Sequence, residues 1–210
     1  MKILVTAGPT YERIDPVRFI GNYSTGKMGF AIAETLAAAG HEVTVVAGPV
    51  QIGLNNPNIK RIDVESAAQM YKAVTEQYPM MDGAVLCAAV ADFTPLVVAD
   101  HKIKREGDNL VIELKPTQDI AAAVGRMKRV RQFLVGFALE TNDEQQHALE
   151  KMRRKNLDFI VLNSLNDKNA CFGFDTNKIT ILKANGEKHL YPLKPKTEVA
   201  KDIMTEIEKL

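Results

Sequence analysis

The chain has 210 residues, of which 46% are hydrophobic, and this is enough to form one sizeable core. Its 27 basic and 26 acidic residues give a formal charge of +1, which offers no electrostatic reason to expect nucleic acid or an anionic membrane as partner. No stretch approaches the ~20 apolar residues that span a bilayer, and the first apolar run is too short for a secretion signal. Cys87 and Cys171 have no metal-ligand or redox spacing, so we expect a cytoplasmic protein with free thiols.

The first half of the chain alternates short apolar strands with helices. A buried strand over 3–6 ends at Gly8-Pro9, and we interpret the polar stretch 11–23 as a long loop, with at most one helical turn. The alanine-rich segment 28–39 predicts a helix that ends at Gly40. The pattern continues with strands at 41–47, 59–64 and 83–90 and a helix at 67–77.

The second half begins with a loop at 92–108 that contains a basic cluster. We then expect a strand at 111–114, a helix with Thr117 as its N-cap, a strand at 133–137, a helix at 142–155 and a strand at 159–162. Asn185-Gly186 predicts a hairpin between strands at 179–182 and 189–193, and an amphipathic helix at 197–210 closes the chain. The sequence therefore predicts a single α/β domain over 1–210: a Rossmann-like, mostly parallel sheet with helices on both faces and a C-terminal antiparallel hairpin.

Polar residues follow the predicted strands, where ligands bind in open parallel sheets. The segment Asn22–Gly29 places Ser24, Thr25, Gly26 and Lys27 directly before an apolar helix. Because helix N-termini attract anions, these residues predict a phosphate site. Later strand ends add Asp92, Lys102, Lys104, Lys115-Pro116-Thr117, Gly136-Phe137 and Asn163, which together have the composition of a nucleotide site.

Three patterns fall short of well-known motifs. Gly21–Lys27 matches a P-loop except that Met28 stands where a magnesium-binding hydroxyl is needed and no strand directly precedes Gly21. Tyr23 and Lys27 have the spacing of a short-chain reductase pair, but Gly26 places Tyr23 before the helix. Lys151 and Lys155 share one helical face, which is either an ordinary solvated surface or a clamp for a triphosphate.

Other candidates have ordinary interpretations as well. Asp92 either caps a local turn, accepts from a ribose or base, or holds a metal; Lys102 is a surface lysine by default, and Phe137 a core residue. No histidine has a partner at metal-ligand spacing, so no metal site built by the protein alone is predicted. Two rival functions remain: an NAD(P)-dependent Rossmann-type reductase, which would lack the glycine turn after its first strand, and a non-enzymatic nucleotide-binding module.

Seven segments occur together in an unusual combination. They are, in chain order, Val5–Thr10, Asp15–Arg18, Asn22–Gly29, Ala88–Phe93, Lys102–Lys104, Gly136–Asn142 and Lys155–Asp158. This order resembles the phosphopantothenate–cysteine ligase family of coenzyme A biosynthesis over nearly the full length. Ser24-Thr25 stands where two serines are common, and Gly21 where a serine is common. Since many bacteria fuse this synthetase behind a flavin-dependent decarboxylase, the chain resembles a stand-alone synthetase or an excised half.

The resemblance implies a ligation in two steps. The carboxylate of 4′-phosphopantothenate attacks the α-phosphorus of a nucleoside triphosphate, which releases pyrophosphate and forms an acyl-nucleotidylate. The amine of L-cysteine then attacks the acyl carbon and releases the nucleoside monophosphate. Bacterial members use CTP and eukaryotic relatives generally ATP. Mg²⁺ would accompany the CTP by bridging its phosphate oxygens, and a homodimer is implied, with the hairpin near Asn185-Gly186 as one candidate interface.

The resemblance also implies roles for individual residues. Lys102 would neutralise charge at the α-phosphate, and Asn22 would bind the activated acyl group through its amide. Asp92 and the backbone near Ala88 and Ala89 would recognise the cytosine or ribose. The remaining residues divide into a nucleotide-pocket lining, Lys115, Pro116, Thr117 and Phe137; a phosphate clamp, Lys151 and Lys155; and a substrate-phosphate site, Gly8, Ser24, Thr25, Gly26 and Lys27.

Overall fold

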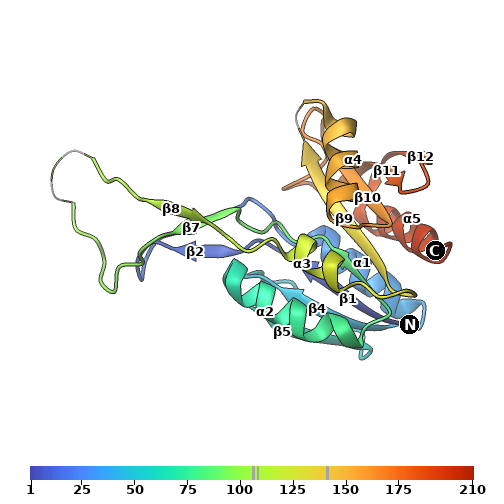
Figure 1. Ribbon diagram of the computed structural model, residues 1–210, viewed down its shortest axis with the longest axis horizontal. Coiled ribbons are helices and arrows are strands. Elements are labelled where there is room, and N and C mark those ends of the chain that lie inside the picture. Colours follow the sequence, from blue (N-terminus) through green and yellow to red (C-terminus); the bar gives the residue numbers. More distant parts are fainter. Residues whose placement is uncertain (106, 108, 141) are drawn as a thin grey trace.

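A central sheet organises the computed structural model, which describes residues 1–105, 107, 109–140 and 142–210 (Figure 1). Within these residues the sheet has eight strands in the order β12-β11-β10-β9-β6-β1-β4-β5. Their bounds are β1 Lys2–Ala7, β4 Glu42–Ala47, β5 Ile59–Asp63, β6 Gly83–Leu86, β9 Phe133–Glu140, β10 Phe159–Ser164, β11 Thr176–Lys183 and β12 Lys188–Pro195. Neighbours from β5 to β10 pair in parallel, whereas β11 and β12 pair antiparallel at one edge.

Helices cover both faces of this sheet. One core cluster joins α1 (Lys27–Ala38) and α5 (Lys196–Ile207) to the sheet through residues such as Ile32, Val5 and Ile203, all with 0% exposure. The other joins α2 (Ala67–Gln77), α3 (Ile120–Met127) and α4 (Glu144–Arg154), and includes Met70 and Val124. A 3₁₀ turn over Tyr78–Met80 follows α2. The predicted Rossmann-like architecture is therefore confirmed. Among the described residues, no helix is long and apolar enough to cross a bilayer.

The strand order fixes where a ligand site can form. The chain builds β1, β4 and β5 outward in one direction and then returns to place β6, β9 and β10 on the other side of β1. The connections therefore diverge beyond the carboxyl ends of β1 and β6, and in open α/β sheets the crevice at this point is where ligands bind. The segments that follow these strands begin at Gly8 and Cys87.

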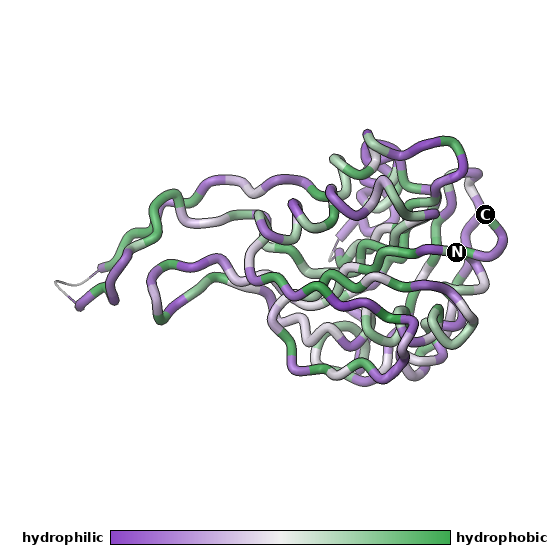
Figure 2. Tube along the Cα trace, turned by 90° about the horizontal axis from the view of Figure 1, so that it is seen from below, coloured by the Kyte–Doolittle hydropathy of each residue, from purple (hydrophilic) through white to green (hydrophobic). Residues whose placement is uncertain are grey.

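An arm extends from this body, built from two antiparallel ribbons (Figure 1). One is the hairpin β2 (Tyr11–Arg13) and β3 (Phe19–Gly21); the other pairs β7 (Phe93–Pro95) with β8 (Leu114–Pro116). The prediction of a loop at 11–23 was wrong, because most of this stretch forms the β2–β3 hairpin. Tyr11 and Phe19 stack across it, with ring centroids 3.8 Å apart. Figure 2 shows that the arm mixes apolar and polar residues along its length.

Several predicted boundaries shift for local reasons. The strand expected at 83–90 ends at Leu86, and the strand expected at 111–114 begins only at Leu114. The N-cap of α3 is Asp119 rather than Thr117: its side chain accepts from Ala122 N at 3.0 Å, whereas Thr117 Oγ1 donates to Ala91 O at 2.7 Å. The predicted hairpin at Asn185-Gly186 is confirmed, with both strands longer than expected. Glu106 and Asp108 of the expected loop, and Thr141 of the family-like segment, lie outside the described residues.

Candidate functional site

Two adjoining pockets occupy the crevice beyond β1, β6 and β9. The first has a volume of about 310 Å³ and is lined by the start of α1; we call it the α1 half. The second, about 300 Å³, is lined by α4 and the start of α3; we call it the α4 half. Both are lined by Ala88, Val90, Asp92, Phe137 and Lys151, so they form one continuous crevice.

The α1 half is suited to an anion. Gly26 is the N-cap of α1 with φ +80°, and Ser24 Oγ accepts from its N–H at 3.3 Å. Within the described residues, no side chain caps this helix and its first turn carries no acidic residue. Thr25, Gly26 and Lys27 line the pocket, and Gly8 packs directly against Gly26. Free backbone N–H groups and a positive helix end therefore face the same space as a lysine.

Asn22 connects the two segments that flank the crevice. Its Nδ2 donates to Ala89 O at 3.0 Å, which links the loop after β1 to the loop after β6. Tyr23, in contrast, is 93% exposed, while Lys27 Nζ lies 2.5 Å from Asp175 Oδ1. The structure therefore does not pair Tyr23 with Lys27 in the way that a short-chain reductase requires.

The α4 half places two partly buried lysines, Lys151 and Lys155, beside the carboxylates of Asp92 and Asp119. Lys155 has a side chain only 11% exposed and lies 2.9 Å from Asp119 Oδ2. Burial, with a further contribution from the neighbouring Lys155, lowers the pKa of Lys151. The ordinary interpretation of this pair as a solvated face is therefore wrong, because both side chains line the pocket. Two partly buried lysines one helical turn apart are suited to an anionic ligand, although Asp119 already pairs with one of them.

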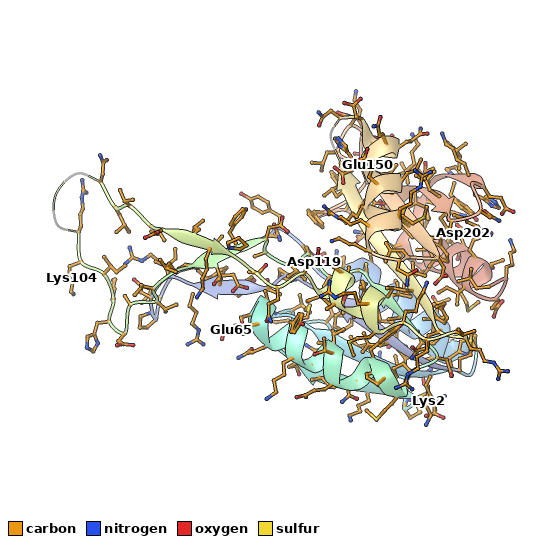
Figure 3. All side chains as sticks on the ribbon, viewed as in Figure 1. Lys2, Glu65, Lys104, Asp119, Glu150 and Asp202 are labelled. Atoms are coloured by element: carbon orange, nitrogen blue, oxygen red, sulfur yellow. The ribbon has the colours of Figure 1, made fainter. Side chains whose placement is uncertain are left out.

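Some predicted site residues lie elsewhere. Lys102 is exposed on the arm and lines neither half of the crevice; Figure 3 shows Lys104 towards the outer part of the arm, well away from Asp119. Lys115 and Pro116 belong to β8 and line a separate groove of about 630 Å³ between the arm and α2. Thr117 lines both that groove and the α4 half. The arm carries Lys102, Lys115 and Pro116 away from the crevice. No local sequence pattern predicted the path of the arm.

Lys196 and Asn177 also line the α1 half, and neither was predicted from the sequence. Lys196 is only 7% exposed, and its ammonium donates to Cys171 O at 2.9 Å and to Phe174 O. Burial lowers the pKa of Lys196, with a further contribution from Lys27. Asn177 Nδ2 donates to Asn163 Oδ1 at 3.2 Å, so an amide pair also lines the pocket. Lys196, at the start of α5, and Asn177, in β11, reach the crevice through contacts with residues distant in the sequence, so only the folded chain brings these residues to the pocket.

Comparison with known proteins assigns the chain to a family. A model of the DNA/pantothenate metabolism flavoprotein C-terminal domain matches residues 1–210. The chain belongs to this family. The resemblance inferred from the seven segments is thereby confirmed. The C-terminal domain of a coenzyme A biosynthesis bifunctional protein CoaBC, known from a crystal structure, has 41% sequence identity and a TM-score of 0.83, covering 99% of this chain and 94% of that one.

Two curated relatives add detail. A coenzyme A biosynthesis bifunctional protein CoaBC of Bacillus subtilis is 45% identical over 208 residues, which are 99% of this chain and 51% of the relative. A cysteine/cysteine sulfinic acid decarboxylase of an unknown prokaryotic organism is 54% identical over 206 residues, 98% of this chain and 57% of the relative. The chain thus spans about half the length of the curated relatives it matches, and their names describe longer proteins.

Proposed function

We propose that this domain joins 4′-phosphopantothenate to L-cysteine, using CTP, in coenzyme A biosynthesis. The observation that carries the proposal is the crevice itself: an uncapped helix end and two sparsely solvated lysines face one space at the point where the strand order reverses. The lysine pair has the charge to bind the phosphates of a nucleotide, and the helix end has the N–H groups to bind the phosphate of 4′-phosphopantothenate. The CoaBC relatives support the choice of pathway.

The first step requires alignment and charge stabilisation rather than a protein nucleophile. The carboxylate of 4′-phosphopantothenate attacks the α-phosphorus, the bond from that phosphorus to the bridging oxygen breaks, and pyrophosphate leaves. Lys151 and Lys155 hold nucleotide phosphates, while Ser24, Thr25 and the start of α1 hold a second phosphate group. Asn22 binds the activated acyl group beside Ala89. The cysteine amine then attacks the acyl carbon and releases CMP.

Mg²⁺ is proposed as a companion of the nucleotide. In the part of the chain that the structure describes, no group of three or more His, Cys, Asp or Glu side chains could hold a metal ion. Such an ion would be held mainly by phosphate oxygens and water, as Mg²⁺ commonly is in nucleotide sites. Asp92, which lines both halves, is the carboxylate we expect nearest to it. When bound, the ion would neutralise charge on the triphosphate.

The proposed role of Lys102 requires a change from the isolated chain, because its side chain lies on the arm. Either the segment 92–108 closes over the crevice, or the arm of a second copy supplies the lysine. We propose a homodimer, and favour the arm over the Asn185-Gly186 hairpin as its interface. Both ribbons of the arm expose apolar side chains. Phe19 is 50% exposed, Val97 78% and Val111 88%. Val111→Glu should then yield monomers in light scattering, whereas Leu190→Glu, on the β12 edge, should not.

The decisive assay follows pyrophosphate. Release should require phosphopantothenate and CTP together, and ligated product should appear only when cysteine is added. Replacing CTP with ATP tests the base preference. Lys102→Gln should abolish the first step while retaining the fold, and full activity in that variant would remove Lys102 from the mechanism. Absence of pyrophosphate release from the wild type under these conditions would reject the ligase.

Two other functions are separated by simple measurements. For a reductase, NADPH rather than CTP with Mg²⁺ should raise the melting temperature; for a non-enzymatic nucleotide-binding module, CTP should bind without any pyrophosphate release. The decarboxylase name of one relative belongs to a protein of which this chain covers 57%. We propose that the decarboxylation resides in the remainder of that protein, and release of CO₂ from cysteine by this domain alone would contradict the assignment.

A further inference from the structure

A buried carboxylate lies inside the arm. Asp15, in the turn between β2 and β3, has a side chain with 0% exposure. Its Oδ1 accepts from the N–H groups of Val17 and Arg18, both at 2.8 Å. Its Oδ2 accepts from Arg18 Nε at 3.0 Å and from the N–H of Ile103 at 3.1 Å. One carboxylate thus joins the hairpin to a segment 88 residues further along the chain.

Arg18 completes the connection from the other side. Its Nη2 donates to Ile103 O at 2.9 Å, so the backbone donor and the backbone acceptor of Ile103 are both bound by this pair. A further backbone bond runs from Ala99 N to Ile14 O at 3.0 Å. The segment 99–103 is therefore fastened to the β2–β3 hairpin at both of its ends.

The charge state of this pair suits a permanent fastening. The bond from Arg18 holds the pKa of Asp15 well below its usual range, although burial alone would raise it. The carboxylate is therefore ionised at any working pH, and charge-assisted bonds to it are shorter and stronger than neutral ones. Lys102 lies immediately before Ile103, so its backbone is fixed while its long side chain remains exposed.

We propose that Asp15 and Arg18 are positioning residues for Lys102, because they clamp the backbone beside it and make the β2–β3 hairpin and the lysine segment one unit. The inference rests on the proposed ligase function of Lys102. A lysine side chain has four rotatable bonds, so its ammonium can be aimed at a phosphate only if the backbone that carries it is held. Closure of the arm, or its docking against a second copy, would then deliver the hairpin and the lysine together.

The test compares two variants of the intact chain with a matched control. Asp15→Asn keeps the shape of the side chain but removes its charge, and Arg18→Lys keeps the charge but loses the planar fork. Each should lower kcat for CTP-dependent pyrophosphate release roughly 10- to 100-fold, with the CTP dissociation constant changed less than about two-fold. In both, the Ile103 amide should exchange with deuterium at least about tenfold faster than in the wild type. Arg13→Gln is the control, because Arg13 lies on the same hairpin but pairs with Glu65, at 2.7 Å.

The outcomes separate the clamp from the ligase. Wild-type exchange at Ile103 in Asp15→Asn and Arg18→Lys would overturn the clamp, and so would full kcat in both variants if Lys102→Gln is inactive. Equal losses in Arg13→Gln would show general loosening of the arm and would also overturn it. Faster exchange confined to the two clamp variants supports the clamp. If the wild type releases no pyrophosphate, the proposed function fails, while the exchange measurement still decides whether the clamp exists.

Discussion

The most sensitive test of the crevice geometry is one methyl group at Gly29. This glycine lies in the first turn of α1, where the helix approaches β1 more closely than a side chain would allow. A Cβ there would lie 2.6 Å from Ala7 Cβ and 3.1 Å from Thr6 O, whereas ordinary contact begins at 3.4 Å. In Gly29→Ala the start of α1 must therefore move away from the sheet by about 0.8 Å.

The size of the effect follows from two opposing contributions. Overpacking costs about 1–3 kcal/mol, and the better helix propensity of alanine returns about 0.5–1 kcal/mol. We expect a net loss of about 1–2 kcal/mol in the free energy of unfolding, which for a chain of this length lowers Tm by roughly 3–6 °C. Because Gly26 and Lys27 move with the helix, a shift approaching 1 Å should also reduce kcat/KM by roughly 10- to 100-fold.

Thermal unfolding and the pyrophosphate assay measure both effects on the same samples. Gly53→Ala is the matched control, since a Cβ at Gly53 meets nothing within 4 Å. Its Tm and kcat/KM should stay near those of the wild type. If Gly29→Ala retains the wild-type Tm and a kcat/KM within about two-fold, close packing of α1 on β1 does not position the proposed anion site, and this role of Gly29 is refuted.

Four further outcomes are expected. Asn22→Asp should lower ligation at least roughly tenfold, because it sets a negative charge beside the acyl phosphate; unchanged turnover would reject that role. Lys155→Met should weaken CTP binding in calorimetry by about tenfold, whereas the exposed Arg154→Met should leave it nearly unchanged. Burial alone would raise the pKa of Glu206, but the hydrogen bonds and charges of Lys183 and Lys209 lower this pKa from 4.5 to about 2. The ionised Glu206 side chain therefore contributes fully to stability above pH 4.5, and the contribution is lost as the pH falls towards 2. Glu206→Gln should therefore lower Tm at pH 7 and approach the wild type near pH 2, and a constant difference would contradict this. Burial raises the pKa of Cys87 to about 12, so iodoacetamide at pH 8 should leave this thiol unmodified in the folded protein; rapid labelling would contradict the assignment.

Sequence reasoning succeeded where a signal is local. The helix that ends before Gly40 and the hairpin at Asn185-Gly186 depend on residues within a few positions of each other, and both are present as expected. The helix start at Ser24–Lys27 is of the same kind, because α1 begins where the local sequence places it. Anion binding at this helix start stays a prediction. The parallel pairing of most strands was also predictable, because strands and helices alternate along the sequence.

Tertiary contacts determined the rest. The stretch 11–23 forms a hairpin because its two strands pair with each other and Asp15 binds Ile103, a partner far along the chain. Lys102 lies on the arm rather than in the crevice for the same reason, and Lys196 reaches the α1 half only because α5 packs beside α1. Periodicity and turn chemistry act over a few residues, so they identify the elements and the residues that end them. The position of a side chain relative to a ligand depends on how distant elements pack, and that information exists only in the folded chain.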